Sequence, residues 1–451
     1  MIKQLLNIAA NTFIEAIRQP IFIVLLTAGW LLQALGVTLS GYTMGLTDSA
    51  EVTKDNKMLL DMGLATVFVC ATLLAALICT SVVSREIENK TALTVISKPI
   101  GRPVFVLGKY LGATAAVLLA GTLLSIFFIL ALRQGVMTTA RDKADIPVII
   151  FGLGSVVLSM GLASWCNFFY GWVFSSTSVL FLTPLLLLGW FGTMILGKGW
   201  TVQPIGTDWK PDVMKTVISV LLAMPVLSAV ALAASTRLGQ VMTITVCVGV
   251  FMGGLLSNHL IGRRAIMNSP VARVEAVEAE RDNDSDFADA ADRWRLTFEL
   301  SPEQSLQAGQ SVYYGPSPNG LGIVVPPHEA FAGDPTSDNA LLEASSPAVL
   351  VRAMDGERLD QIIVVNAGGL AVSRPPQVGD YLFLQPTAYN PVALGAWGVV
   401  PNMQFFWLVD AVTQAHEIPM SYVRKTALYA LLQVIALNGL AVLLFQRREV
   451  G

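Results

Sequence analysis

Long runs without a single charged residue divide the chain into membrane-length segments. A bilayer crossing needs about 20 predominantly apolar residues, and seven charge-free runs reach that length. They are Gln19–Thr47, Met62–Ser84, Tyr110–Leu132, Ile146–Gly197, Thr216–Thr236, Leu238–Gly262 and Thr426–Gln446. The fourth run is long enough for two crossings, with a hairpin break expected between Asn167 and Ser178, around Gly171. The pattern predicts about eight transmembrane helices.

Residues 1–18 precede the first crossing and have a different pattern. Apolar side chains recur there at helical spacing, at Ile2, Leu5, Leu6, Ala9, Phe13 and Ile17. Polar residues, among them Lys3, Glu15 and Arg18, occupy the other side. This pattern predicts an amphipathic helix in the membrane interface, with an ordinary helical extension of the first span as the alternative.

Composition supports the same class of protein. Of the 451 residues, 54% are hydrophobic and 14% are charged, against about a quarter charged in an average soluble domain. The formal net charge is −3 and no basic cluster interleaved with aromatic residues occurs, so nucleic acid is not an expected partner. The chain is therefore expected to be a polytopic helical protein surrounded by membrane lipids, with seven spans in residues 19–262.

A non-membrane insert separates the last two predicted spans. Residues 263–293 are rich in charge and predict a solvated linker or short helix. Residues 294–400 change to short β-type segments punctuated by Gly, Pro, Asn and Asp. The predicted strands lie within Trp294–Leu300, Gly322–Pro326, Gln361–Asn366 and Asp380–Gln385. We expect a small β sandwich or barrel, followed in residues 401–451 by the last span and a basic tail.

Lys and Arg indicate the orientation, because they accumulate on the cytoplasmic side of membrane proteins. The segment 85–109 between the second and third spans holds five of them, and the tail contains Arg447 and Arg448. If both are cytoplasmic, an even number of spans places the amino end inside as well. The insert is then extracytoplasmic.

No energy-converting chemistry is evident in the chain itself. A phosphate-binding loop needs G-x-x-x-x-G-K-[ST], but Gly108-Lys109 is followed by Tyr110 and preceded by Gly101, seven positions before Gly108. The charge-free runs hold no ionisable Asp, Glu, Lys, Arg or His apart from His259 near the end of one run, which disfavours coupling to a proton or sodium gradient. We expect no cofactor in this chain, no catalytic or metal-binding residues, and an energy source in another subunit.

The segment 85–109 also carries a family resemblance. It begins Arg85-Glu-Ile-Glu, continues Lys90-Thr-Ala-Leu, and closes with Lys98-Pro-Ile-Gly-Arg102 and Gly108-Lys109. Together with the preceding helix and the ending from Pro401 through the last span, this resembles the type-two ABC transporter permease family. The resemblance implies a cytoplasmic coupling helix that docks into a separate ATPase subunit, which binds ATP and Mg. It further implies a homodimer or heterodimer of permeases, working as an exporter in the bacterial inner (cytoplasmic) membrane.

The resemblance assigns the ATPase-coupling role to a defined set of residues. They are Glu86, Glu88, Thr91, Ala92, Leu93, Val95, Ile96, Lys98, Pro99, Arg102 and Lys109. Their apolar members form a small face between charged ends, which suits a helix that enters a partner's groove. Pro99 and Pro103 are expected to end this helix before the next span.

Two alternatives stand beside this interpretation. The segment 85–109 could be an ordinary cytoplasmic loop, and the whole chain could be a membrane-anchored binding or assembly scaffold whose β-rich insert recruits a partner, for example in the periplasm. The family usually has six spans and no insert of this kind, so its substrate path cannot be transferred to these residues.

Overall fold

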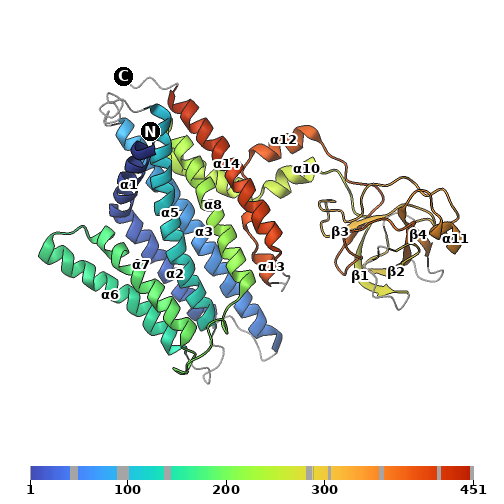
Figure 1. Ribbon diagram of the computed structural model, residues 1–451, viewed down its shortest axis with the longest axis horizontal. Helices are drawn as coiled ribbons and strands as arrows, with labels where there is room; N and C mark the ends of the chain where they lie inside the picture. The colour runs from blue at the N-terminus through green and yellow to red at the C-terminus, as the bar shows by residue number, and fades with distance from the viewer. Residues whose placement is uncertain are drawn as a thin grey trace. The chain divides into compact units, whose positions relative to one another are not determined.

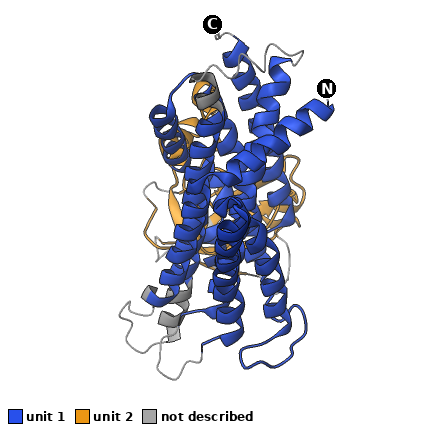
Figure 2. Cartoon of the chain, turned by 90° about the vertical axis from the view of Figure 1, so that its left-hand side faces the viewer, with its two compact units in different colours: residues 1–255, 401–451 blue, residues 256–400 orange. Residues whose placement is uncertain are grey.

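The chain folds into two compact units, which Figure 2 distinguishes by colour. Unit 1 comprises residues 1–255 and 401–451, and unit 2 comprises residues 256–400. The computed structural model describes residues 2–40, 49–88, 101–136, 144–280, 287, 289–302, 306–354, 360–413 and 418–446 (Figure 1). The insert expected from the sequence is therefore a separate body, and its boundary lies at Leu256.

Unit 1 is built from α-helices. They are α1 (Ile2–Arg18), α2 (Pro20–Ser40), α3 (Ser49–Glu88), α5 (Arg102–Gln134), α6 (Ile146–Tyr170), α7 (Phe174–Ile195), α8 (Pro211–Ser235), α9 (Gln240–Leu255), the 3₁₀ turn η2 (Met403–Phe406), α13 (Val409–Thr413) and α14 (Met420–Gln446). Among the described residues, seven helices are long and apolar enough to cross a membrane, and two interrupted helix pairs raise that number to as many as nine. The prediction of about eight membrane helices is confirmed.

The outer surface of these helices is apolar. Val157 on α6, Leu188 on α7 and Leu431 on α14 are all more than half exposed. Such a continuous apolar exterior is stable in lipid, where a helix satisfies its own backbone groups. The centre is formed by α3, α5 and α8, which pack so closely that a Cβ on Gly121 of α5 would lie 2.3 Å from the Met224 sulfur of α8.

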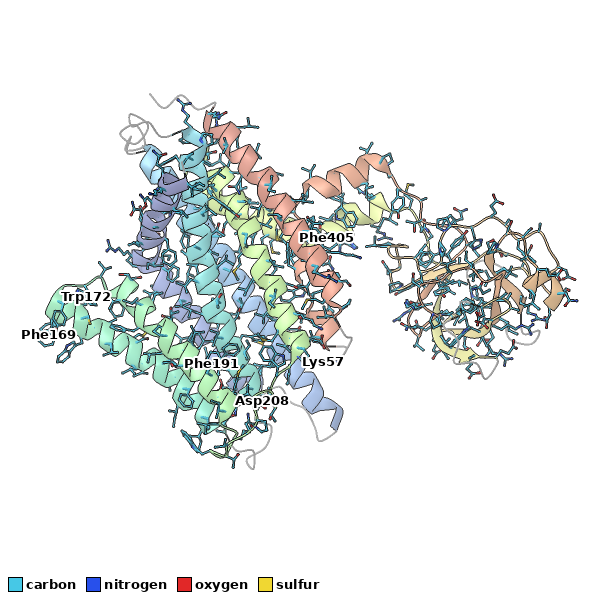
Figure 3. The ribbon with its side chains drawn as sticks, in the orientation of Figure 1. Lys57, Phe169, Trp172, Phe191, Asp208 and Phe405 are labelled. Carbon is cyan, nitrogen blue, oxygen red and sulfur yellow. The ribbon has the colours of Figure 1, made fainter. Side chains whose placement is uncertain are left out.

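The hairpin break inside the fourth apolar run is confirmed. Helix α6 ends at Tyr170, Gly171 adopts a left-handed φ of 67°, and α7 begins at Phe174. Figure 3 shows Phe169 and Trp172 at the tip of this hairpin, and both side chains are exposed. Aromatic side chains of this kind are typical of the membrane–water interface.

The expected seventh span, Leu238–Gly262, is shorter in the structure. Helix α9 has 16 residues and measures about 24 Å, less than the ~30 Å hydrocarbon core. Its end packs against the segment that follows the insert, because a Cβ on Gly254 would lie 2.5 Å from the Pro401 carbonyl oxygen. Both segments line α3, where the Phe68 ring contacts Phe251 at 4.9 Å and Trp407 at 6.1 Å between centroids. In the sequence, unit 2 thus interrupts two segments of unit 1 that both pack on α3.

Unit 2 contains a six-stranded antiparallel sheet. Its strands are β1 (Ala272–Ala279), β2 (Arg293–Phe298), β3 (Tyr313–Gly315), β4 (Ala348–Met354), β5 (Gln361–Ala367) and β6 (Tyr381–Phe383), in the order β3-β6-β1-β2-β5-β4. The sheet nearly closes on itself, because Ser311, just before β3, pairs with Leu350 of β4. This β barrel confirms the expected β-rich insert. Short helices accompany it: the π-helical turn η1 (Asn258–Gly262), α10 (Arg263–Ala265), α11 (Asp338–Leu342) and α12 (Pro391–Val399).

Two details of the insert differ from the sequence prediction. Residues 263–293, expected to be a charged linker or short helix, contain β1, where Val274 is buried and its neighbours Arg273 and Glu275 are exposed. The charge on the solvent face of this strand conceals its apolar alternation. Residues 322–326 form no strand, since Gly322 adopts a φ of 75° and Pro326 has no N–H for a ladder.

Three ionisable residues of unit 2, Asp380, Arg374 and Tyr314, are joined by hydrogen bonds. Asp380 forms a two-bond ion pair with the Arg374 guanidinium, at 2.6 and 2.7 Å. The hydroxyl of the fully buried Tyr314 donates to the Arg374 carbonyl at 2.7 Å, and burial raises the pKa of this phenol above its ordinary value. These contacts give Asp380 and Tyr314 structural roles.

Candidate functional site

The predicted coupling residues fall at the junction of α3 and α5. Thr91, Ala92, Leu93, Val95, Ile96, Lys98 and Pro99 lie outside the described residues. The backbone of Glu86 and Glu88 belongs to the last turns of α3. Arg102 and Lys109 lie in the first two turns of α5, and Pro103 occupies a first-turn position that suits proline. The docking helix itself therefore stays a prediction.

Arg102 connects the start of α5 to the end of α14. Its Nη1 donates to the carbonyl of Gln446 at 3.0 Å, which satisfies one of the otherwise unpaired groups at that helix end. One turn further on, the rings of Phe105 and Phe445 stack with centroids 5.8 Å apart. Arg102, a member of the predicted coupling set, is thus tied to the end of α14.

Lys109 connects the same part of α5 to α1. Its side chain is only 7% exposed, and its Nζ lies 3.6 Å from Glu15 Oε2 and 5.8 Å from the centroid of Phe105. Gly108 and Gly112 flank it on the face that α1 covers. A Cβ at Gly112 would lie 2.3 Å from the Ala9 carbonyl oxygen, so only glycine permits this approach. The spacing G-x-x-x-G is a common contact between closely packed membrane helices.

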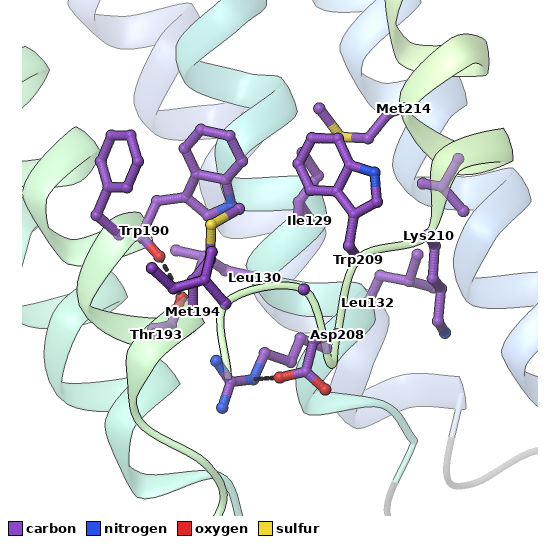
Figure 4. A pocket seen from close by; sticks show the side chains of 15 residues that line it. Ile129, Leu130, Leu132, Trp190, Thr193, Met194, Asp208, Trp209, Lys210 and Met214 are labelled. Atoms are coloured by element: carbon purple, nitrogen blue, oxygen red, sulfur yellow. Dashed lines mark hydrogen bonds and ion pairs between the residues drawn. The ribbon is translucent and has the colours of Figure 1, made fainter. Parts of the chain in front are cut away.

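A cavity of about 720 Å³ lies at the other end of α5. Four elements enclose it: the ends of α5 and α7, the connecting segment 196–210, and the start of α8. Its lining residues are Ile129, Leu130, Leu132, Arg133, Trp190, Phe191, Thr193, Met194, Ile205, Gly206, Asp208, Trp209, Lys210, Val213 and Met214. Figure 4 shows the side chains of Trp209 and Met214 above those of Asp208 and Lys210. The cavity therefore has an apolar part and a polar part.

Arg133 is the centre of the polar part. Its Nε lies 3.1 Å from Asp145 Oδ2 and 3.3 Å from Asp208 Oδ2, and its Nη2 donates to the Leu196 carbonyl at 2.6 Å. Arg133 is 10% exposed and Asp145 is fully buried, whereas Asp208 is 42% exposed. Gln203 donates to Asp208 at 2.6 Å. This network fixes the connecting segment to α5 and α6.

The sequence prediction did not include these cavity residues. One signal was present: Arg133 directly follows the charge-free run that ends at Leu132, and Asp145 directly precedes the run that begins at Ile146. Charges that adjoin two consecutive spans lie at the same membrane face and can pair. Nothing in the sequence indicated that the segment 196–210 folds back to add Asp208 and Trp209.

The fold and these sites define a multi-pass helical membrane protein with an inserted β barrel. No protein-family model, no curated protein and no solved structure matches the chain. The finer assignment of function therefore depends on the chain's own residues and contacts.

Proposed function

We propose that this chain is the permease subunit of an ATP-binding-cassette transporter, an exporter driven by a separate ATPase through residues 85–109. The observation that carries the proposal is the length of the two helices that frame this segment. Helix α3 has 40 residues and α5 has 33, which correspond to about 60 and 50 Å. Both exceed the ~30 Å hydrocarbon core. The excess of α5 lies mainly beside the segment, because residues 102–109 precede its charge-free run Tyr110–Leu132, whereas most of the excess of α3, residues 49–61, lies at the far end of that helix. The start of α5 therefore extends beyond the apolar span, where a soluble partner can reach it.

The contacts of α5 support a mechanical role for the segment. A displacement of residues 89–100 acts directly on Arg102. From there, the bond to Gln446 leads into α14, and the Lys109–Glu15 pair leads into α1. Nucleotide binding in the partner would then bias a two-state equilibrium of the bundle through rigid contacts, alternating access to the substrate.

The proposal includes the partners and the location. ATP and Mg bind to the partner ATPase, where hydrolysis takes place, and this chain contributes no catalytic residue. Two permease copies, identical or homologous, work with two ATPases in the bacterial inner membrane. The β barrel faces the periplasm and recruits a substrate or a periplasmic partner.

Co-purification with the ATPase encoded beside this chain tests the proposal. The intact chain should retain the ATPase in mild detergent, and the complex should hydrolyse ATP. The double variant Leu93→Asp/Ile96→Asp should lose both, because charge on the apolar face prevents burial in the partner's groove.

A matched control places two new aspartates on exposed positions at the other end of the bundle. Val202→Asp/Thr207→Asp should retain the ATPase as the unaltered chain does. The proposal is wrong if the intact chain never retains the ATPase, or if Leu93→Asp/Ile96→Asp retains it equally well.

A scaffold is the second candidate, and the independent closure of the β barrel favours it. The barrel has its own core and nearly closes through the pairing of Ser311 with Leu350. Deleting residues 270–395 separates the two functions: a scaffold loses all activity, whereas a permease keeps nucleotide-dependent changes in its helices. A cysteine at Ser317 should react with an impermeant reagent in spheroplasts if the barrel is periplasmic, and protection there would place it on the cytoplasmic side.

A further inference from the structure

We propose that the 720 Å³ cavity at the carboxyl end of α5 binds one molecule of a zwitterionic, lipid-like amphiphile. The apolar chain of this ligand lies between α5, α7 and α8, and its head group lies beside Arg133, Asp208 and Lys210. This binding does not depend on an ATPase, so it can hold whether or not the chain is a permease.

The size and the polarity of the cavity suit such a ligand. Its volume falls within the ~300–1,000 Å³ range of small-molecule sites. Ile129, Trp190 and Met214, which lie further from the connecting segment, supply apolar walls, and Arg133 lies about one helical turn beyond Ile129 toward the end of α5. The lining therefore changes from apolar to charged along the axis of α5, in the same order as the chain and the head group of a lipid.

The polar end is a built site. Arg133 is nine-tenths buried, and its Nη1 has no hydrogen-bond partner within the described part of the chain. A buried donor left without a partner costs about 1–3 kcal/mol, so a small shift of the guanidinium toward a ligand oxygen in the cavity that Arg133 lines would be favourable. Asp145, which is fully buried, holds the guanidinium in place from α6.

The charges select a head group that carries both signs. Arg133 is shared between two carboxylates, those of Asp145 and Asp208, and Lys210 adds a second cation on the rim. The four groups sum to zero charge. An anionic phosphate fits beside Arg133 and Lys210, while an ammonium group fits beside the half-exposed Asp208. A purely cationic head group would lie beside the like charges of Arg133 and Lys210, and a purely anionic one beside the like charge of Asp208.

Protection of a cysteine in the cavity tests the proposal on the full-length chain in amphipol. Met194→Cys places a thiol in the cavity wall, and its alkylation by N-ethylmaleimide is quantified at the peptide level, so that native cysteines do not interfere. Palmitoyl lysophosphatidylcholine should protect it saturably, slowing alkylation about tenfold at ten times its dissociation constant. Palmitoyl lysophosphatidylglycerol and cetyltrimethylammonium should protect at clearly higher concentrations.

Matched controls separate the cavity from general lipid contact. Val157→Cys, on the lipid-facing side of α6, should show no saturable protection. In the Met194→Cys background, Lys210→Glu should shift the preference toward cetyltrimethylammonium, whereas Lys198→Glu in the same connecting segment should not.

Three outcomes would overturn the proposal: equal protection by all three amphiphiles, equal protection of Val157→Cys and Met194→Cys, or no saturable protection. Native mass spectrometry of the unaltered chain provides a measurement free of substitutions. After addition of palmitoyl lysophosphatidylcholine, the spectrum should show one tightly bound molecule per chain. A spectrum without this bound species contradicts the proposal.

Discussion

Gly112→Ala tests whether the contact between α1 and α5 stabilises the helical bundle. The added methyl group would lie 2.3 Å from the Ala9 carbonyl oxygen and 2.6 Å from the Thr12 Cβ. Both atoms belong to α1, and one of them is backbone, so a rotamer change cannot relieve the overlap. Helix α1 must move away from α5, which also strains the nearby pair between Lys109 and Glu15.

The expected magnitude follows from two opposing terms. Overpacking of a close contact costs about 1–3 kcal/mol. Replacing a mid-helix glycine with alanine returns up to ~1 kcal/mol of helix propensity. Gly161 on α6 isolates the second term, because a Cβ added there would meet no atom of the described residues within 4 Å. Gly112→Ala should therefore be less stable than Gly161→Ala by about 1–3 kcal/mol.

Thermal unfolding of the solubilised chain, followed by size-exclusion chromatography, measures this difference. The midpoint should fall for Gly112→Ala and stay unchanged or rise for Gly161→Ala. Trypsin cleavage after Arg18, at the end of α1, should become faster only in Gly112→Ala. If both variants unfold at the same temperature and Arg18 is cleaved equally in both, α1 does not depend on the glycine contact.

Two further predictions concern buried polar groups. Asp145→Ala should destabilise the chain by about 3 kcal/mol or more, because it removes the fully buried carboxylate that pairs with the buried Arg133. Asp208→Ala should cost about 1 kcal/mol or less, because Asp208 is 42% exposed. Thermal midpoints in the reverse order would contradict the assignment. The Tyr314 phenol has a pKa raised by burial, so the unfolded chain ionises first and the stability of the β barrel should fall as the pH rises above about 10. Tyr314→Phe should reduce this alkaline dependence, and the part that remains comes from Tyr313, whose pKa burial also raises. The same substitution should cost about 1 kcal/mol at neutral pH through loss of the bond to Arg374. Near-UV circular dichroism during thermal unfolding measures both effects, and an unchanged alkaline dependence would refute the role of Tyr314.

Patterns of consecutive residues were enough to specify the class of protein and most of its helices. A charge-free run of bilayer length can satisfy its backbone only as a helix, so runs such as Tyr110–Leu132 predict helices without any knowledge of their neighbours. The hairpin at Gly171 follows for a similar local reason, because a left-handed φ favours glycine. The amphipathic pattern of residues 2–17 likewise specifies α1. The coupling role of Leu93 and Ile96 stays a prediction, since it concerns a contact with another protein.

The way in which distant parts of the chain come together became apparent only in three dimensions. The network of Arg133, Asp145 and Asp208 joins residues from three segments, and no local pattern encodes the return of the last one. The end of α9 at Leu255 was equally hidden, because the apolar run continues into unit 2 and hydropathy does not record which body a residue packs against. Local propensity and apolar length are properties of consecutive residues, whereas cavities, ion pairs and barrel closure depend on distances between residues far apart in the chain.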